Sequence, residues 1–307
     1  MRFDKEEGHP APWNREMETS MNEIFTPLLT STDWNEEWKQ LQKARKAADD
    51  AAYWDEKAKT FPVKHGSQEG YVKGFLDLAG VKPGETVLDM GCGTGSLATP
   101  LAQAGVHVIA CDFSRGMLDK MREDQAVLGV SGVDVRQMSW ADDWEACGLA
   151  PNSVDVALAS RSIATSDLRE SLMKLDRVAR RRVCATLPCG PSPRTDERLL
   201  EAVGIGYRGG RDFMYAFNIL AAMGINPEMA YIPSVRMELF ESRAEALASF
   251  TNMLEQALLG LATDEELAAI PERLEPWLDR NLVQDERGFH LSEDRKVTWA
   301  FIAWEPR

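Results

Sequence analysis

A short run of glycines after an acidic residue is the part of this sequence best suited to chemistry. Asp89 lies near the end of an apolar stretch, residues 86–90, and Gly91, Gly93 and Gly95 follow at alternate positions. A strand, a tight glycine turn and a helix bring backbone N–H groups against a polar ligand, and the helix N-terminus favours negative charge. This segment therefore predicts a ligand-binding turn.

The spacing of the glycines bears on the class of ligand. A dinucleotide fingerprint, Gly-x-Gly-x-x-Gly, needs its third glycine at position 96, where this chain has Ser96. The extra glycine is instead Gly95, which gives the pattern Asp-x-Gly-x-Gly-x-Gly. A turn that binds no phosphate at all is a further alternative at this point.

The elements that position this turn alternate between strand and helix. Repeated alternation predicts an α/β fold, a doubly wound parallel sheet with helices on both faces. Such sheets bind their ligands at the carboxyl ends of the strands, near the point where the strand order reverses. We expect strands over residues 86–90, 106–111, 133–138, 154–160 and 182–187.

Helices are expected before this core, and a different pattern follows it. From Asp33 to about Thr60 apolar residues recur at helical spacing, which predicts one helix, and Asp33 with Glu36 forms a capping-box pattern at its start. Alternation over residues 235–239 predicts a strand, and the apolar residues 297–304 predict a buried strand. Two helices are expected between these strands.

Composition and charge exclude several classes of protein. The 307 residues are 44% apolar and 27% charged, the balance of a folded globular protein. The net charge of −14 would repel nucleic acid over most of the surface.

No apolar run approaches the roughly 18 residues of a membrane helix, and the N-terminus shows no signal peptide. The five cysteines are scattered without a Cys-x-x-Cys pair, so no thiolate metal site is predicted. We expect a cytoplasmic protein that binds neither nucleic acid nor membrane.

Asp89-x-Gly91-x-Gly93-x-Gly95 resembles the first motif of the class I S-adenosylmethionine-dependent methyltransferases. A second apolar stretch supports the resemblance, because it ends in Asp112, 21 residues after Gly91. Residues 113–118 also resemble the family's continuation, and the likeness covers about residues 53–187. The resemblance implies a Rossmann-like, seven-stranded sheet with an antiparallel last strand, and S-adenosylmethionine as the cofactor.

The family's first motif implies roles for the residues of the turn. Gly91 and Gly93 would border the methionine part of the cofactor, and Asp89 would hold its amino group directly or through water. Cys92 and Gly95 belong to the same cofactor-binding turn.

The next two strand ends are implied to bind the nucleoside. Asp112 would accept hydrogen bonds from the ribose hydroxyls, and Phe113 and Met117 would pack on the adenine. The family often has an acid after the third strand, but this chain departs from that pattern. Its adenine contacts would instead come from Ser139, Trp140 or Asp142.

Substrate-side residues are harder to assign, because methyl transfer needs no fixed triad. Tyr53-Trp54-x-x-Lys57-Ala58-x-x-Phe61 resembles the family's N-terminal lid helix, and Ser160 and Arg161 would face the reacting end. We take His65, Arg161 and Tyr215 as catalytic candidates. A solvated loop, an ordinary ion pair and a core position are the respective alternatives for these three residues.

The expected function is methyl transfer to a small-molecule acceptor by in-line displacement, in which catalysis is mainly alignment and exclusion of water. The alternatives are a non-catalytic module that binds the cofactor or its demethylated product, and a nicotinamide-dependent oxidoreductase, which Ser96 disfavours. The protein is expected to be a monomer or homodimer without a metal.

Four regions follow from this interpretation. Residues 1–67 would form an N-terminal arm and helical lid, residues 68–240 the cofactor-binding core, and residues 296–307 its final strand. Residues 241–295 would form a helical insertion, where the family usually has a short hairpin. We expect this insertion to be a substrate cap.

Overall fold

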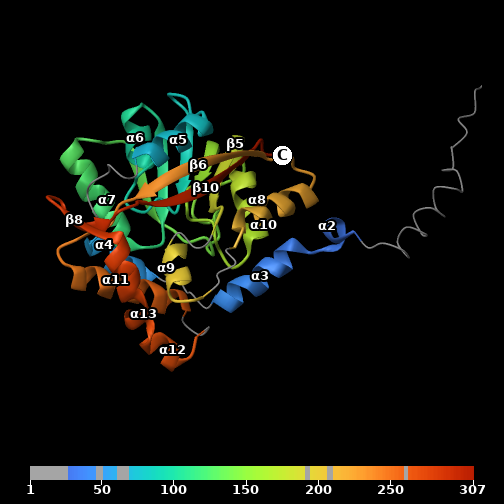
Figure 1. Ribbon diagram of the computed structural model, residues 1–307. Coiled ribbons are helices and arrows are strands. Elements are labelled where there is room, and N and C mark those ends of the chain that lie inside the picture. Colours follow the sequence, from blue (N-terminus) through green and yellow to red (C-terminus); the bar gives the residue numbers. More distant parts are fainter. Residues whose placement is uncertain (1–26, 46–50, 61–68, 191–193, 206–209, 259–261) are drawn as a thin grey trace, which may run out of the picture.

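The strands expected from the sequence assemble into one central sheet (Figure 1). The computed structural model describes residues 27–45, 51–60, 69–190, 194–205, 210–258 and 262–307. The sheet has seven strands in the order β3-β2-β1-β4-β5-β10-β6, and β10 is antiparallel to both of its neighbours. The expected doubly wound fold with an antiparallel last strand is confirmed.

Strands and helices alternate along this core. The strands are β1 (Thr86–Met90), β2 (His107–Asp112), β3 (Val133–Gln137), β4 (Val154–Ala159), β5 (Ala179–Pro188), β6 (Glu228–Arg236) and β10 (Arg295–Trp304). The helices are α5 (Glu69–Ala79), α6 (Ala98–Gln103), α7 (Arg115–Leu128), α8 (Leu168–Val178), α9 (Glu197–Ala202) and α10 (Asp212–Ala222). The strand order reverses between β1 and β4, which places the binding crevice at their carboxyl ends.

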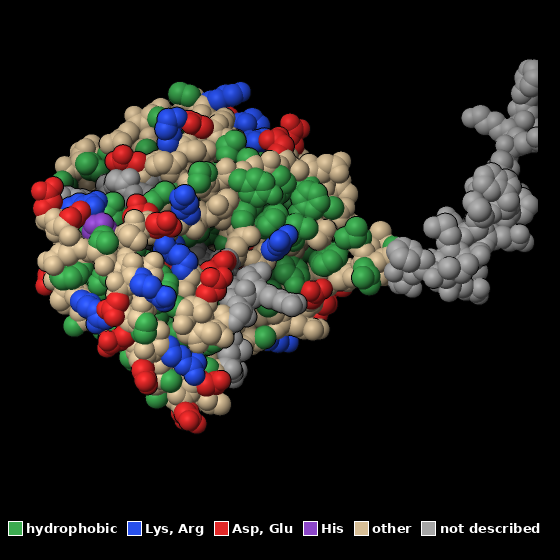
Figure 2. All heavy atoms as spheres, viewed as in Figure 1, with side chains coloured by type: hydrophobic (Ala, Val, Ile, Leu, Met, Phe, Trp, Pro, Cys, Tyr) green, Lys and Arg blue, Asp and Glu red, His purple; other side chains and the backbone are tan. Residues whose placement is uncertain are grey.

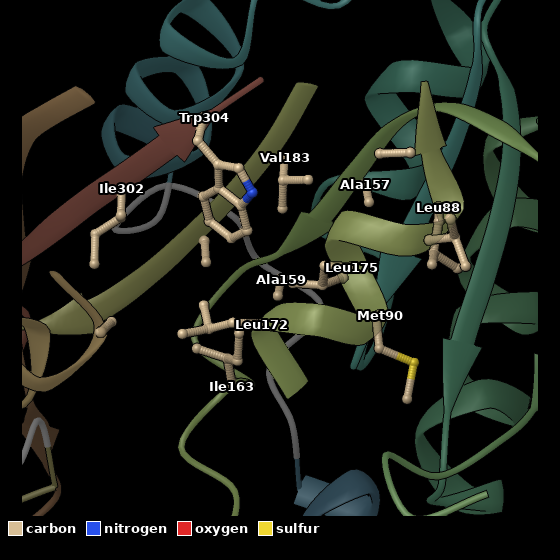
Figure 3. Packing of buried hydrophobic residues seen from close by; sticks show 14 of the residues in the cluster. Leu88, Met90, Ala157, Ala159, Ile163, Leu172, Leu175, Val183, Ile302 and Trp304 are labelled. Atoms are coloured by element: carbon tan, nitrogen blue, oxygen red, sulfur yellow. The ribbon is translucent and has the colours of Figure 1, made fainter. Parts of the chain in front are cut away.

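Two apolar layers bury the faces of the sheet. On one face, α8 and α10 cover a core that includes Leu172, Leu175 and Trp304, part of which Figure 3 shows. On the other face, α5 and α6 cover a core that includes Tyr71 and Phe75. Burial on both sides explains why the parallel strands read as nearly continuous apolar runs in the sequence.

The N-terminal segment contains two long helices where we expected one. Helix α3 (Trp34–Arg45) packs on α8 and α10, whereas α4 (Ala51–Thr60) packs on α7, and a short α2 (Leu28–Ser31) precedes them. The expectation of a single helix up to Thr60 is therefore wrong. The cap is confirmed, since Oδ1 of Asp33 accepts hydrogen bonds from the backbone N–H groups of Asn35 and Glu36, at 3.0 and 3.2 Å.

The C-terminal third also corrects the sequence interpretation. Strand β6 already ends at Arg236, and the alternating residues 235–239 do not form a strand of their own. The insertion has the expected helices, but it also contributes two strands to a second, three-stranded sheet in the order β7-β9-β8. The strand β7 (Leu239–Phe240) precedes the insertion. The insertion itself contains α11 (Arg243–Leu258), α12 (Asp264–Ala268), α13 (Ile270–Asn281), β8 (Leu282–Asp285) and β9 (Gly288–Leu291).

The insertion has an apolar core of its own. Phe250 and Leu254 of α11 pack there with Leu274 of α13, and Leu199 and Leu200 of α9 complete it. Figure 1 shows these helices gathered on one side of the central sheet. The insertion is thus anchored to the main core through the segment that follows β5.

Charges are mixed over the surface of the molecule. Figure 2 shows acidic and basic side chains interspersed on one face. Ion pairs such as Arg181 with Glu85 and Arg182 with Glu228 connect neighbouring elements. In the described part of the chain, no helix is long and apolar enough to cross a membrane.

Candidate functional site

The glycine turn connects the carboxyl end of β1 to α6. Gly91, Gly93 and Gly95 have φ of 74°, 55° and 80°, the left-handed region in which a side chain is strained. A Cβ on Gly91 would lie 2.3 Å from the Cβ of Ser162, and one on Gly95 would lie 2.5 Å from the Sδ of Met121. Neighbouring segments therefore pack so closely on this turn that two of its three positions have no room for a side chain.

Asp89 is buried near this turn with one carboxylate oxygen unpaired. Its side chain is 2% exposed, and Oδ2 has no hydrogen-bond partner among the described residues. Burial, followed by the charge of Asp112, raises the pKa of Asp89 to about 7. Because an unpaired buried oxygen is costly, this position suits a ligand that donates hydrogen bonds.

Asp112 lies at the carboxyl end of the neighbouring strand β2. Its Oδ2 accepts a hydrogen bond from the N–H of Gly93 at 2.9 Å, and its Oδ1 accepts one from the N–H of Ser114 at 2.9 Å. Burial raises the pKa of this carboxyl as well. Each oxygen keeps further acceptor capacity, so the carboxylate can receive two more donors side by side.

Three other expected cofactor residues flank the two acids. Met117 is buried in the first turn of α7, where its N–H donates to the capping Oγ of Ser114 at 3.1 Å. Phe113 is half-buried just before this helix. Cys92 is buried in the glycine turn, and its N–H donates to the carbonyl of Cys111 at 3.0 Å. The structure thus brings these three residues close to the ends of β1 and β2.

The segment after β3 is occupied by local contacts. The N–H of Ser139 donates to Oδ2 of Asp142 at 2.7 Å. The ring of Trp140 packs on Trp144 with 5.4 Å between centroids, and its carbonyl accepts a hydrogen bond from Nζ of Lys174 at 2.7 Å. Which of these residues contacts the adenine stays a prediction.

Helix α4 docks on the first turn of α7. Oδ1 of Asp55 accepts hydrogen bonds from Oγ of Ser114 at 2.6 Å and from the N–H of Gly116 at 2.9 Å. These two bonds lower the pKa of Asp55, and a carboxylate at a helix N-terminus is favourable. A Cβ on Gly116 would lie 3.0 Å from the Cα of Asp55, so the two helices are in close contact. Helix α4 is therefore held against the segment that follows Asp112.

The aromatic pair of α4 contacts the loop that follows β5. The rings of Tyr53 and Trp54 lie 5.4 Å apart, and the Cζ of Arg194 lies 5.7 Å from the first and 5.4 Å from the second. A guanidinium over aromatic faces is attractive. Helix α4 therefore touches segments that follow two different strands, β2 and β5.

The segment after β4 is held by a buried hydroxyl network. The hydroxyl of Tyr71 lies 2.8 Å from both Oγ of Ser160 and Oγ1 of Thr186, and the N–H of Arg161 donates to Oγ1 of Thr186 at 3.0 Å. Arg161 has φ of 59°, and its Cζ lies 4.3 Å from the ring of Tyr71 and 5.9 Å from that of Trp299. A non-glycine residue in this region is strained, and such residues cluster at functional sites.

The three catalytic candidates have different positions. Arg161 lies at the carboxyl end of β4, beside the glycine turn. Tyr215 instead joins α10 to α3, where its hydroxyl donates to Oε1 of Glu37 at 2.7 Å. Burial and Glu37 raise the pKa of Tyr215 to about 12, so its hydroxyl stays protonated at neutral pH, and its catalytic role stays a prediction. His65 lies outside the described residues.

Asp55, Tyr71 and Trp299 belong to this site but were not foreseen. Tyr71 and Trp299 lie in apolar stretches of α5 and β10, and nothing in their local sequence distinguishes them from core residues. Asp55 lies inside the expected lid motif, at a position that the motif leaves open, so its place next to Trp54 was the one available signal.

Two of the chain's thiols, Cys92 and Cys111, lie at this site. No group of three or more histidine, cysteine or acidic residues in the described segments could hold a metal ion. All five cysteines are free thiols, and burial raises the pKa of Cys92 and Cys111. These two thiols therefore stay protonated at neutral pH.

Known proteins are similar to parts of this chain. A family model described as a methyltransferase domain matches residues 87–182. A Haemophilus influenzae protein described as uncharacterised is 32% identical over 252 residues, which is 82% of this chain and 88% of that protein. A demethylmenaquinone methyltransferase of Beutenbergia cavernae is 40% identical over 67 residues, 22% of this chain and 28% of that protein. The structure of the Bacillus subtilis YcgJ protein aligns with 80% of this chain and 99% of its own, with a TM-score of 0.48 and 17% identity.

The chain belongs to the class I S-adenosylmethionine-dependent methyltransferase superfamily. It is a methyltransferase, and S-adenosylmethionine is its cofactor.

Proposed function

We propose that this methyltransferase transfers the methyl group of S-adenosylmethionine to a small-molecule acceptor by in-line displacement. The observation that carries the proposal is the buried, unpaired Oδ2 of Asp89 beside the glycine turn. The ammonium group of the cofactor's methionine part supplies the donor that this oxygen lacks. Its positive charge also favours the ionised form of the carboxyl group.

The nucleoside binds at the end of β2 in this proposal. The two ribose hydroxyls donate to the oxygens of Asp112, which already accept one backbone N–H each. Phe113 and Met117 pack on the adenine. Helix α4 covers the nucleoside as a lid, because Asp55 holds it against the first turn of α7.

Several observations support a small molecule as the acceptor. The net charge of −14 disfavours a polyanionic acceptor. Demethylmenaquinone methyltransferases are among the relatives that match the cofactor-binding core. The insertion is a substrate cap in this proposal, and a contact of 3.8 Å between Nη1 of Arg295 and Sδ of Met253 links β10 to α11.

The chain's own residues mainly orient the reactants and exclude water. The bound cofactor supplies a methyl group activated by its sulfonium. Ser160 and Arg161 lie at the reacting end of the crevice, where the network of Tyr71 and Thr186 fixes their backbone. A fixed backbone keeps the acceptor atom in line with the methyl group, which is the main source of acceleration in such a reaction.

Calorimetric titration and a transfer assay test the proposal. The purified protein should bind S-adenosylmethionine but not NAD, and it should transfer labelled methyl to a component of a small-metabolite extract. Binding without transfer to any component would indicate a non-catalytic module. Binding of NAD instead would point to an oxidoreductase.

A further inference from the structure

Three hydroxyl groups form a hydrogen-bonded chain between α5 and the ends of β4 and β5. The hydroxyl of Tyr71 on α5 lies 2.8 Å from Oγ of Ser160, which directly follows β4, and 2.8 Å from Oγ1 of Thr186 on β5. Tyr71 is 1% exposed and Thr186 is fully buried, whereas Ser160 is half-buried. The Ser160 end of the chain is therefore the end that a ligand can reach.

This chain has more protons than hydrogen bonds. Each of the three hydroxyls carries one proton. Burial raises the pKa of Tyr71 above its ordinary value, so its hydroxyl also stays protonated. The three hydroxyls share two hydrogen bonds with one another. One of the three protons must therefore point out of the chain.

Burial decides which hydroxyl carries this outward proton. Among the described residues, the hydroxyls of Tyr71 and Thr186 have no acceptor outside the chain, and a buried donor without an acceptor is costly. The N–H of Arg161 donates to Oγ1 of Thr186 at 3.0 Å, so it supplies a further donor there and no acceptor. The least costly arrangement has Thr186 donating to Tyr71 and Tyr71 donating to Ser160. Ser160 then keeps a proton that no described residue accepts.

The segment that carries Ser160 lies against the glycine turn. Two residues further along, Oγ of Ser162 donates to the carbonyl of Met90 at the end of β1, at 2.6 Å. A Cβ on Gly91 would lie 2.3 Å from the Cβ of Ser162. The hydroxyl of Ser160 is thus held at the carboxyl end of β4, beside the turn at which the proposed function places the methionine part of the cofactor.

A second donor without an acceptor packs on the same tyrosine. Trp299 is 4% exposed, and its Nε1 has no hydrogen-bond partner among the described residues. Its ring lies edge-on to that of Tyr71, with 6.0 Å between the centroids. Its register partner is Pro188, the last residue of β5, so Trp299 lies at the carboxyl edge of the sheet. Two donors next to Tyr71 therefore lack acceptors, which favours ligand atoms that carry lone pairs.

We propose that Ser160 donates a hydrogen bond to the methyl acceptor, and that the acceptor carries a carbonyl oxygen or a ring nitrogen at this position. This inference rests on the proposed function and names the substrate class for the same site. The bonded atom is a neighbour of the nucleophile, since a hydrogen bond to the attacking lone pair would slow the transfer. Tyr71 and Thr186 are positioning residues, because they hold the proton of Ser160 toward the ligand. A site built to donate a hydrogen bond rejects an analogue that lacks the accepting atom.

Probe pairs that differ in one acceptor atom test this donor on protein saturated with S-adenosylhomocysteine at pH 8. Acetophenone is compared with ethylbenzene, and pyridine with benzene. Binding is measured by the shift of the indole N–H signal of Trp299, which is assigned with Trp299→Phe, and by calorimetry. At least one acceptor-bearing probe should bind more tightly than its hydrocarbon partner. Equal binding within both pairs, or no binding of any probe, would overturn the proposal.

Variants assign this preference to the hydroxyl chain. Ser160→Ala should lower the affinity ratio within a pair about tenfold by removing the donor, and it should leave the affinity for S-adenosylhomocysteine unchanged. Thr186→Val should lower the ratio less, because the proton of Ser160 is no longer directed, and Thr186→Ser should restore it. A merely structural role would weaken both members of a pair alike. Ser171→Ala on α8 is the control, because it removes another buried, hydrogen-bonded serine hydroxyl.

The outcomes separate this inference from the proposed function. If Ser160→Ala loses affinity for S-adenosylhomocysteine, the hydroxyl binds the cofactor and the inference is wrong. If the wild-type protein binds S-adenosylhomocysteine but Ser160→Ala leaves the affinity ratios unchanged, the inference alone fails. If the wild-type protein does not bind S-adenosylhomocysteine, the proposed function fails, and titration of the cofactor-free protein with the probe pairs still tests the donor.

Discussion

At the scale of single residues, Asp89 combines a cost to folding with a gain in binding. Its burial raises the pKa of the folded protein's carboxyl group to about 7, above the ordinary value of 3.8. The folded state therefore binds this proton more tightly than the unfolded state. The contribution of Asp89 to stability is fully present below about pH 4 and is lost as the pH rises through 7.

Asp89→Asn should remove this pH dependence, because an amide does not ionise. We expect the cofactor-free variant to be more stable than the wild type at pH 8, by on the order of a few kcal/mol, since one pKa unit is about 1.4 kcal/mol. The same variant should lose most of its affinity for S-adenosylmethionine. Denaturant unfolding at pH 5 and pH 8 measures the first effect, with Asp77→Asn on the exposed face of α5 as the control. Parallel stability curves for wild type and variant would contradict the assigned pKa.

At the scale of elements, the contact between α4 and α7 is what would hold the proposed lid closed. Gly116→Ala would place a methyl group 3.0 Å from the Cα of Asp55 and 3.2 Å from its carbonyl oxygen. Helix α4 must then move away, which weakens the hydrogen bonds of Asp55 to Ser114 and Gly116.

We expect Gly116→Ala to release the cofactor several-fold faster, although alanine is about 1 kcal/mol better than glycine inside a helix. Stopped-flow displacement of S-adenosylhomocysteine measures this rate. Gly70→Ala is the matched control, since a Cβ there meets no atom within 4 Å. A normal release rate for Gly116→Ala would show that α4 does not act as a lid.

At the scale of the whole molecule, the separate core of the insertion allows cap and cofactor site to be perturbed independently. Phe250 is fully buried in that core. Phe250→Ala should cost about 3–5 kcal/mol and loosen the insertion and α9. Hydrogen exchange should localise this opening to α9, α11 and α13.

If the insertion is the substrate cap, the same variant should lose methyl transfer while its affinity for S-adenosylhomocysteine stays normal. The rate of methyl transfer is measured with the identified acceptor. The affinity for S-adenosylhomocysteine is measured by calorimetry. Normal transfer by a variant with a loosened insertion would remove the insertion from the substrate site.

The sequence was sufficient to predict those strands and helix caps that depend on a local residue pattern. Strands β1, β2 and β4 are short, largely apolar runs bounded by turns, and Ser114, Asp167 and Asp196 cap their helices as their residue types predict. Strand β7 has two residues and β8 is largely exposed, so neither has an apolar periodicity that could reveal the second sheet.

The residues of the site also differ in whether the sequence alone reveals them. Asp89 and Asp112 belong to a motif at fixed spacing, so they could be found in the sequence. The opposition of Arg236 and Arg295 could not be found in this way, because the two residues come from strand ends far apart in the chain and meet only through the pairing of β6 with β10. The alternation around Arg236 predicted a strand over residues 235–239. A strand is present there, but it is the end of β6, which stops at Arg236.

The most direct test of the central claim is the affinity for S-adenosylmethionine of the wild-type protein and of Asp112→Ala, measured by calorimetry at pH 8. Loss of two hydrogen bonds to a charged group, at about 1.5–3 kcal/mol each, predicts at least 100-fold weaker binding. Asp112→Asn, which keeps one acceptor oxygen, should lie between the two, and circular dichroism should show that both variants are folded. Equal affinity in all three folded proteins would contradict a cofactor site at the ends of β1 and β2.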